Sequence, residues 1–237
     1  MRPKIHPLGD QGLLLDWGQQ LDLGVHQQVQ ACWRAIEALH LPGVLDLIPA
    51  YSSLAILWDT AFLLQNYPQR LPFEWVTSWI EPVLQGQKND QQVGEKRRVE
   101  VPVCFEEPYA LDLEELAAEK QLSVAQFIER FCAQPYRVYL LGFLPGFAYM
   151  GTVEPALASP RRAVPRALIP AGSVGIAGAQ TGIYPLDSPG GWQIIGCTPW
   201  RMFTPEVDPP VRLRVGDEVV FYPIRALEFE GMRTKTE

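Results

Sequence analysis

The first half of the chain combines short apolar runs with two longer stretches in which apolar residues recur every three or four positions. Residues at this spacing share one face of an α-helix, so the two stretches predict amphipathic helices. The short runs at 13–15, 45–48 and 54–58 predict strands. The order strand, helix, strand, strand, helix predicts a small α+β domain. The helical stripes consist of Val25, Val29, Cys32, Trp33, Ile36 and Leu39, and of Phe73, Val76, Ile80 and Leu84.

A polar segment interrupts this pattern near the middle of the chain. The sequence QGQKNDQQVGEKRR at 85–98 has one aliphatic residue in fourteen. Segments of this composition commonly separate domains. We therefore predict an N-terminal domain at 1–86, a linker at 85–98, a second domain at 97–225 and a C-terminal tail at 226–237.

The second half begins with an alternating strand pattern at 98–103 and continues with two short helices. Asp112 with Glu115, and Ser123 with Gln126, have the spacing of a capping box at a helix start. Beyond Tyr136 we find no helical period, only short apolar runs broken by Gly and Pro, ending in RLRVGDEVVFYPI. Many short strands with such punctuation predict a closed β-barrel.

The run from Pro170 to Pro199 is rich in residues that bend the backbone. It contains seven glycines, four prolines and a single charged residue, Asp187. This density favours a bent path that neither a helix nor a long strand can follow. The run also carries many branched and aromatic side chains, which disordered segments lack. We interpret it as an ordered surface of loops and strands that lines a cleft.

Composition and charge narrow the class of protein. The 237 residues carry a formal net charge of -7, which disfavours binding to nucleic acid. The four cysteines form no C-x-x-C pair and indicate free thiols in a reducing compartment. The sequence shows neither a signal-like apolar segment nor a stretch long enough to span a membrane. We expect a cytoplasmic protein that does not bind membranes.

Several chemistries are disfavoured by the residues themselves. All three histidines precede residue 41, so the second half has no Ser-His-Asp or Cys-His arrangement of its own. Ser173 lies in G-S-x-G rather than in the G-x-S-x-G of a nucleophile elbow. The sequence contains no phosphate-binding glycine motif and no carboxylate cluster suited to a metal. We expect no metal site and no recognisable nucleotide motif in this chain.

Polar side chains in apolar surroundings remain as candidates for a binding site. An arginine can bond both oxygens of a carboxylate, and a glutamine can both donate to and accept from an amide. The set therefore indicates recognition of a small carboxylate or amide. The alternative is that these groups bond loop backbone and surface acids. The set comprises Arg161, Arg162, Arg166, Gln180, Thr181, Tyr184, Asp187, Ser188, Trp192 and Gln193.

A second motif precedes these residues. The sequence GFLPGFAYMG at 142–151 places three aromatic residues around a Pro-Gly turn. Aromatic residues at such a position either wall a pocket or fill one end of a barrel.

These motifs resemble the hallmark stretches of the KipI family. The resemblance rests on GFLPGFAYMG, on PRRAVPRALIPAGSVGIAGAQTGIYPLDSPGGWQIIGCTP at 160–199, and on PLGDQGLLLDWG and IPAYSSLAILWD in the first half. The family includes the B subunit of bacterial 5-oxoprolinase and the first subunit of allophanate hydrolase. The resemblance implies a small α+β N-terminal domain followed by a mainly-β, cyclophilin-like barrel.

The resemblance also implies a function. Most bacterial members resemble the B subunit of an ATP-dependent 5-oxoprolinase, which opens 5-oxo-L-proline to L-glutamate together with the A and C subunits. ATP is then used at the level of the complex, and the isolated chain is not expected to be active. The alternative from the same family is an inhibitor that binds a sensor histidine kinase. A component of allophanate hydrolase or urea carboxylase is less favoured, because the chain has no biotin-accepting A-M-K-M-like segment.

Site residues are carried over by position from the resemblance. Arg166 is expected to bind the substrate carboxylate, and Gln180 and Tyr184 to orient the amide. The expected substrate-binding set is Pro145, Gly146, Phe147, Thr181, Ser188 and Trp192. Glu106, Glu107 and Phe131 stand where the family pattern has a Gly-Gly pair and a His.

Overall fold

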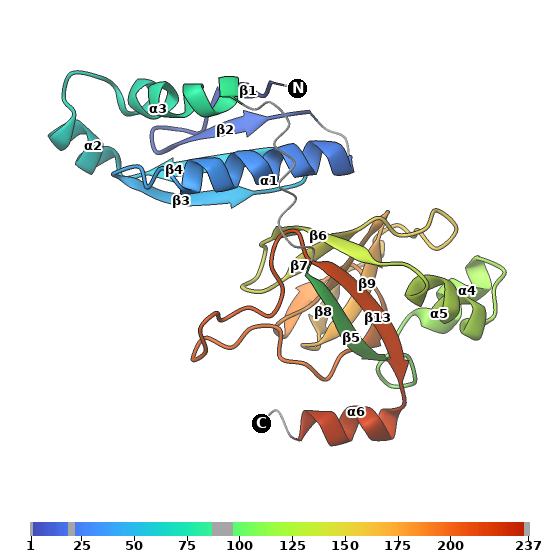
Figure 1. Ribbon diagram of the computed structural model, residues 1–237. Helices are drawn as coiled ribbons and strands as arrows, with labels where there is room; N and C mark the ends of the chain where they lie inside the picture. Colours follow the sequence, from blue (N-terminus) through green and yellow to red (C-terminus); the bar gives the residue numbers. More distant parts are fainter. Residues whose placement is uncertain (1, 19–21, 87–96, 235–237) are drawn as a thin grey trace. The chain divides into compact units, whose positions relative to one another are not determined.

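The computed structural model describes residues 2–18, 22–86 and 97–234 (Figure 1). The chain divides into two compact units, Met1–Glu95 and Lys96–Glu237. Most of the segment predicted as a linker, at 85–98, lies outside the described residues. Each unit has its own hydrophobic core.

The N-terminal unit is an antiparallel sheet in the order β1-β2-β4-β3, packed against helices. The two predicted helices are present and supply buried residues such as Val29 and Ile80 to its core, although Leu39 of the first stripe lies beyond the helix end and is exposed. The sequence pattern missed β1, which is largely exposed, and α2, which buries only Leu63. Its elements are β1 (Lys4–Pro7), β2 (Gly12–Asp16), α1 (Leu23–Glu37), β3 (Val44–Pro49), β4 (Ser53–Trp58), α2 (Thr60–Asn66) and α3 (Pro72–Gly86).

The C-terminal unit is built on a closed barrel with the strand order β10-β7-β6-β13-β5-β12-β9 (Figure 1). This confirms the mainly-β barrel expected from the sequence. Neighbouring strands are antiparallel except β5 and β13, which run parallel. Its strands are β5 (Arg98–Cys104), β6 (Tyr136–Leu141), β7 (Ala148–Gly151), β9 (Ser173–Ala177), β10 (Gln180–Ile183), β12 (Gln193–Cys197) and β13 (Glu218–Ile224). A separate hairpin pairs β8 (Arg166–Ile169) with β11 (Ser188–Gly190).

Two helices lie between β5 and β6 and pack on the barrel: α4 (Leu113–Glu119) and α5 (Val124–Cys132). Ser123 and Gln126 form the predicted capping box at the start of α5. Phe131 of α5 is fully buried and stacks on Phe221 of β13, with the ring centroids 5.1 Å apart. The side chain at position 131 therefore belongs to the barrel core.

The expectation of no helix beyond Tyr136 was wrong, because α6 (Ala226–Arg233) forms within the segment expected as a tail. The sequence signal is weak because only Phe229 of this helix is buried, whereas Leu227 is 86% exposed. Phe229 packs on Tyr109, and the Glu106 carboxylate accepts a hydrogen bond from the Ala226 N–H at the helix start. Glu106 thus has a structural role in this chain.

Candidate functional site

Four aromatic side chains gather on the outer face of the barrel. Met150 and Ala148 of β7 point into the barrel core, so the alternation of side chains along a strand places Phe147 and Tyr149 outside. Phe147 is the centre of the group: its ring meets those of its three neighbours at centroid distances of 4.7 to 5.4 Å. We call this group the aromatic cluster; its members are Phe147, Tyr149, Tyr184 and Trp192.

Glycines of the Pro170–Pro199 run make room for these rings. A Cβ on Gly182 of β10 would lie 3.0 Å from the Phe147 ring, and a Cβ on Gly175 of β9 would lie 3.1 Å from the Trp192 Cβ. At Gly190 of β11, a Cβ would overlap the Tyr184 hydroxyl. Close packing therefore requires glycine at these positions.

The aromatic cluster is packed rather than hollow. Phe147, Tyr184 and Trp192 are all at least 96% buried, and Ile169 of β8 and Ile194 of β12 pack with them. Burial raises the pKa of the Tyr184 phenol to about 12, against a smaller opposing effect of a hydrogen bond with the Trp192 backbone. The cluster can serve as an apolar floor for a ligand. A ligand would contact it at its accessible edge, beside the half-buried Tyr149, which we call the rim.

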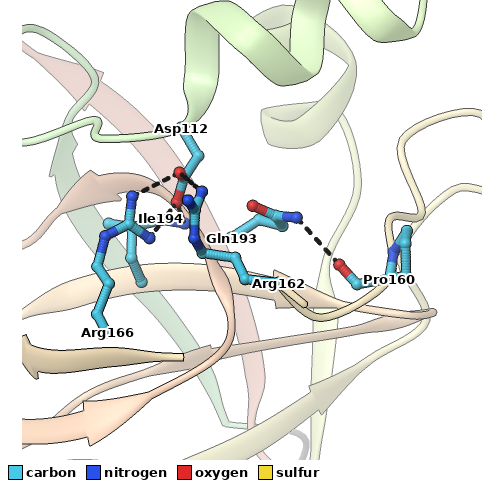
Figure 2. A network of polar contacts seen from close by, with 6 residues as sticks. All are labelled: Asp112, Pro160, Arg162, Arg166, Gln193 and Ile194. Carbon is cyan, nitrogen blue, oxygen red and sulfur yellow. Dashed lines mark hydrogen bonds and ion pairs between the residues drawn. The ribbon is translucent and has the colours of Figure 1, made fainter. Parts of the chain in front are cut away.

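A buried carboxylate holds the segments beside this floor together (Figure 2). Asp112, at the start of α4, is 2% exposed, and its carboxylate accepts from Arg162, Arg166 and the Ile194 backbone N–H at 2.6 to 2.9 Å. Figure 2 shows the two guanidinium groups converging on this one side chain. Charge-assisted bonds of this kind offset the cost of burying a charge.

Asp112 does not play the role predicted from its spacing to Glu115. Its side chain makes no capping hydrogen bond to α4, because both oxygens are bonded to the arginines and Ile194. The spacing of Asp112 and Glu115 predicts the correct helix start, but not that the Asp112 carboxylate bonds the two arginines. Only the partners identify its role, and they lie 50 to 82 positions away in the chain.

Arg166, expected to bind a carboxylate, makes two hydrogen bonds to the carboxylate of Asp112 within the same chain. Arg162 shares that carboxylate. Two guanidinium groups on one carboxylate leave a formal charge of about +1 in this network, so it still favours an anion nearby. The side chains of Arg166 and Arg162 are 23% and 33% exposed, respectively.

The remaining predicted residues divide between the barrel interior and its surface. Thr181 is fully buried, and its hydroxyl donates to the Gly175 carbonyl. Ser188 is buried in β11, whereas Pro145 is exposed and Gly146 has a φ of 81°. Gln180 is half-buried on β10, two residues from Gly182 and therefore on the outer face of the barrel. The structure thus gathers Phe147, Tyr184 and Trp192 closely, places Gln180 on the same face, and uses Thr181 in the interior.

The described residues hold neither a metal cluster nor a membrane-spanning helix. Within 2–18, 22–86 and 97–234, no group of three or more His, Cys, Asp or Glu side chains is arranged to hold a metal ion. Among the helices in these ranges, none has the length and apolar character needed to cross a membrane.

The C-terminal unit is thus a closed barrel that carries the aromatic cluster and the Asp112–arginine network on its outer face. The chain belongs to the family described as carboxyltransferase domain, subdomain C and D, whose model matches residues 3–213.

Relatives with an assigned function span nearly the whole chain. The chain is 40% identical over 238 residues to the 5-oxoprolinase B subunit of Bacillus subtilis, covering 100% of this chain and 99% of that protein. It is 37% identical over 225 residues to the 5-oxoprolinase B subunit of Escherichia coli O157:H7, covering 94% and 96%.

Solved structures show the same fold. TTHA0988 superposes with a TM-score of 0.75 at 34% identity; the match covers 91% of this chain and spans 40% of that one. The urea amidolyase of K. lactis has a TM-score of 0.75 at 19% identity, covering 99% of this chain and 16% of its own, and this likeness concerns the fold alone.

The packing at Gly190 can be tested against its neighbour in sequence. We expect Gly190→Ala to lower the free energy of unfolding by about 1–3 kcal/mol, because the added methyl group meets the Tyr184 hydroxyl and the Ile169 Cδ1. The control is Gly191→Ala, where a Cβ would have only ordinary contacts at 3.7 Å or more. Chemical denaturation measures both; equal stabilities for the two variants would contradict the packing.

The role of Asp112 can be tested by removing only its charge. We expect Asp112→Asn to lower the free energy of unfolding by about 2–3 kcal/mol, because two partly buried guanidinium groups lose their counter-charge. The exposed Glu114 in the first turn of the same helix gives the control variant Glu114→Gln, with an expected loss below about 1 kcal/mol. A loss of stability for Asp112→Asn as small as that of Glu114→Gln would refute the role of the Asp112 carboxylate in holding the two arginines.

Proposed function

We propose that this chain is the B subunit of an ATP-dependent 5-oxoprolinase, which converts 5-oxo-L-proline to L-glutamate together with the A and C subunits. The observation that carries the proposal is the 40% identity to a protein of that name over the full length of both chains. The second relative of the same name, at 37% identity, supports it independently.

The chemistry of the site suits such a substrate. 5-Oxoproline presents an apolar ring edge, a lactam amide and a carboxylate, and the lactam is a stable amide whose opening is driven by ATP. The aromatic cluster offers an apolar floor for the ring. Gln180 on the outer face can both donate to and accept from the lactam. The positive charge of Arg166 and Arg162, only half balanced by Asp112, favours the carboxylate.

Within this proposal the predicted residues take distinct parts. Phe147 and Trp192 form the floor. Tyr184 holds Trp192 in place through the hydrogen bond with the Trp192 backbone. Arg166 supplies positive charge while it positions β8 through Asp112. Pro145, with Gly146, shapes the turn that leads into Phe147.

The partners and the nucleotide complete the proposal. A protein designated by the letter B among subunits implies further subunits, and we assign these as A and C, with ATP used by the assembled complex in the cytoplasm. The isolated chain is then not expected to turn over 5-oxoproline. A bound lactam above a closed floor would have one open side, which a partner protein can cover.

Reconstitution tests the proposed function. We expect the A and C subunits with this chain to hydrolyse ATP in a 5-oxoproline-dependent manner and to form glutamate, and omission of this chain to abolish both. Arg166→Ala is expected to lower kcat/KM for 5-oxoproline by about 10- to 100-fold, because it removes positive charge beside the site and the bond that positions β8.

Thermal unfolding of Arg166→Ala is measured in parallel, because the substitution also removes a partner of Asp112. Arg166→Lys retains the charge but not the paired geometry, and is expected to be intermediate. Full 5-oxoproline-dependent turnover by the A and C subunits alone would refute the assignment.

A further inference from the structure

Three arginines precede or begin β8, and the structure separates one of them from the other two. Arg162 and Arg166 are bonded to Asp112. Arg161 is exposed, and among the residues that the structure describes it forms no ion pair with a carboxylate. Its guanidinium therefore retains its donors and its charge for a ligand.

The backbone on both sides of Arg161 is tied to the barrel. The Arg162 N–H donates to the Gly191 carbonyl at 2.7 Å. The Pro160 carbonyl accepts from the Gln193 side-chain amide at 3.1 Å, as Figure 2 shows. Because Gly191 and Gln193 flank Trp192, these two bonds place Arg161 beside Trp192 of the aromatic cluster.

A third bond fixes the same segment next to β10. The Ser159 carbonyl accepts from the Gly178 N–H at 2.7 Å, in the turn between β9 and β10. The segment from Ser159 to Arg162 is thus held at three points. It lies beside the turn that leads into β10, the strand that begins with Gln180. A side chain on so fixed a backbone is preorganised for binding, which lowers the entropic cost of holding a ligand.

The charge of Arg161 acts on the hydroxyl end of the cluster. It lowers the pKa of the phenols of both Tyr149 and Tyr184, opposing the larger effect of burial, which raises them. Tyr149 is half-buried, whereas Tyr184 is 1% exposed, so Tyr149 is the more accessible of the two tyrosines. The bonds at Pro160 and Arg162 place Arg161 beside Trp192, and the Tyr149 ring packs on Trp192 with a centroid distance of 5.8 Å, so Arg161 and Tyr149 border the same part of the floor.

We infer that Arg161 is the residue that binds the substrate carboxylate, with the Tyr149 hydroxyl as a second donor at the same rim. The inference rests on the proposed function and reassigns its carboxylate contact from Arg166 to Arg161. A guanidinium that pairs with no carboxylate in the described part of the chain can bond both oxygens of a ligand carboxylate. Arg166 positions β8, and Arg161 binds the ligand and determines specificity for an acid.

The test uses the reconstituted three-subunit complex and two substrates. We expect Arg161→Ala to raise KM for 5-oxoproline by about 10- to 100-fold while KM for ATP and the thermal unfolding midpoint stay unchanged. With 2-pyrrolidinone, the same lactam without a carboxylate, the substitution is expected to change kcat/KM less than about twofold. Arg161→Lys is expected to recover part of the loss, because lysine keeps the positive charge but lacks the paired N–H donors of the guanidinium.

Arg201 supplies the matched control, since it is also an exposed arginine of the C-terminal unit. Arg201→Ala is expected to leave both substrates unaffected. An active wild-type complex with an unchanged KM for 5-oxoproline in Arg161→Ala would overturn the inference alone. An equal loss for 5-oxoproline and 2-pyrrolidinone would also overturn it, because the effect would not depend on the carboxylate. An inactive wild-type complex would instead refute the proposed function.

Discussion

The outer surface of the barrel depends on one buried carboxylate. Asp112 is 2% exposed, and a charge so far from water is tolerated only when it is fully bonded. Its partners come from three separate parts of the chain: the segment before β8, β8 itself and β12. The same residue also donates its backbone N–H to the Ile194 carbonyl. One side chain therefore fixes the start of α4 against the hairpin and the barrel wall.

Besides Ile194, which packs with the aromatic cluster and bonds to Asp112, a pair of residues in the hairpin joins this polar network to the cluster. Arg166, bonded to Asp112, lies opposite Gly190 in the pairing of β8 with β11. Gly190 in turn leaves the space that the Tyr184 hydroxyl occupies. The position of the arginine thus sets how closely the hairpin covers the aromatic rings. The hairpin is thus held by the Arg166–Asp112 bonds at one strand and by close packing of Gly190 on Tyr184 at the other. Both constraints favour the same arrangement of the surface.

Local sequence patterns predicted the barrel strand that begins at Arg98, the many short strands beyond Tyr136 and the longer helices, because these elements carry their periodicity within a few residues. The helix start at Ser123 was predicted because a capping box is also local. The role of Asp112 was not predicted. Residues 112 and 115 have the same spacing as 123 and 126, but the Asp112 carboxylate bonds distant arginines instead of capping the helix. Helix α6 was missed because its single buried residue, Phe229, produces no stripe. For the site, the family resemblance pointed to Phe147, Tyr184 and Trp192 but not to Tyr149, and their place outside the barrel follows from strand register, which the sequence does not display.

The distribution of charge explains why three neighbouring arginines need not act alike. A buried carboxylate attracts the guanidinium groups that can reach it, and Arg162 and Arg166 are within 2.6 Å of Asp112. Arg161 lies between two backbone bonds that hold its neighbours to Gly191 and Gln193, so its own side chain is available at the rim. The two arginines paired with Asp112 hold the surface segments in place, and the proposal gives the remaining arginine the role of attracting an anion. Because the floor below is closed by Phe147 and Trp192, a ligand held at this rim has one face uncovered. If the chain acts as a subunit of the proposed complex, a second protein surface covers that face.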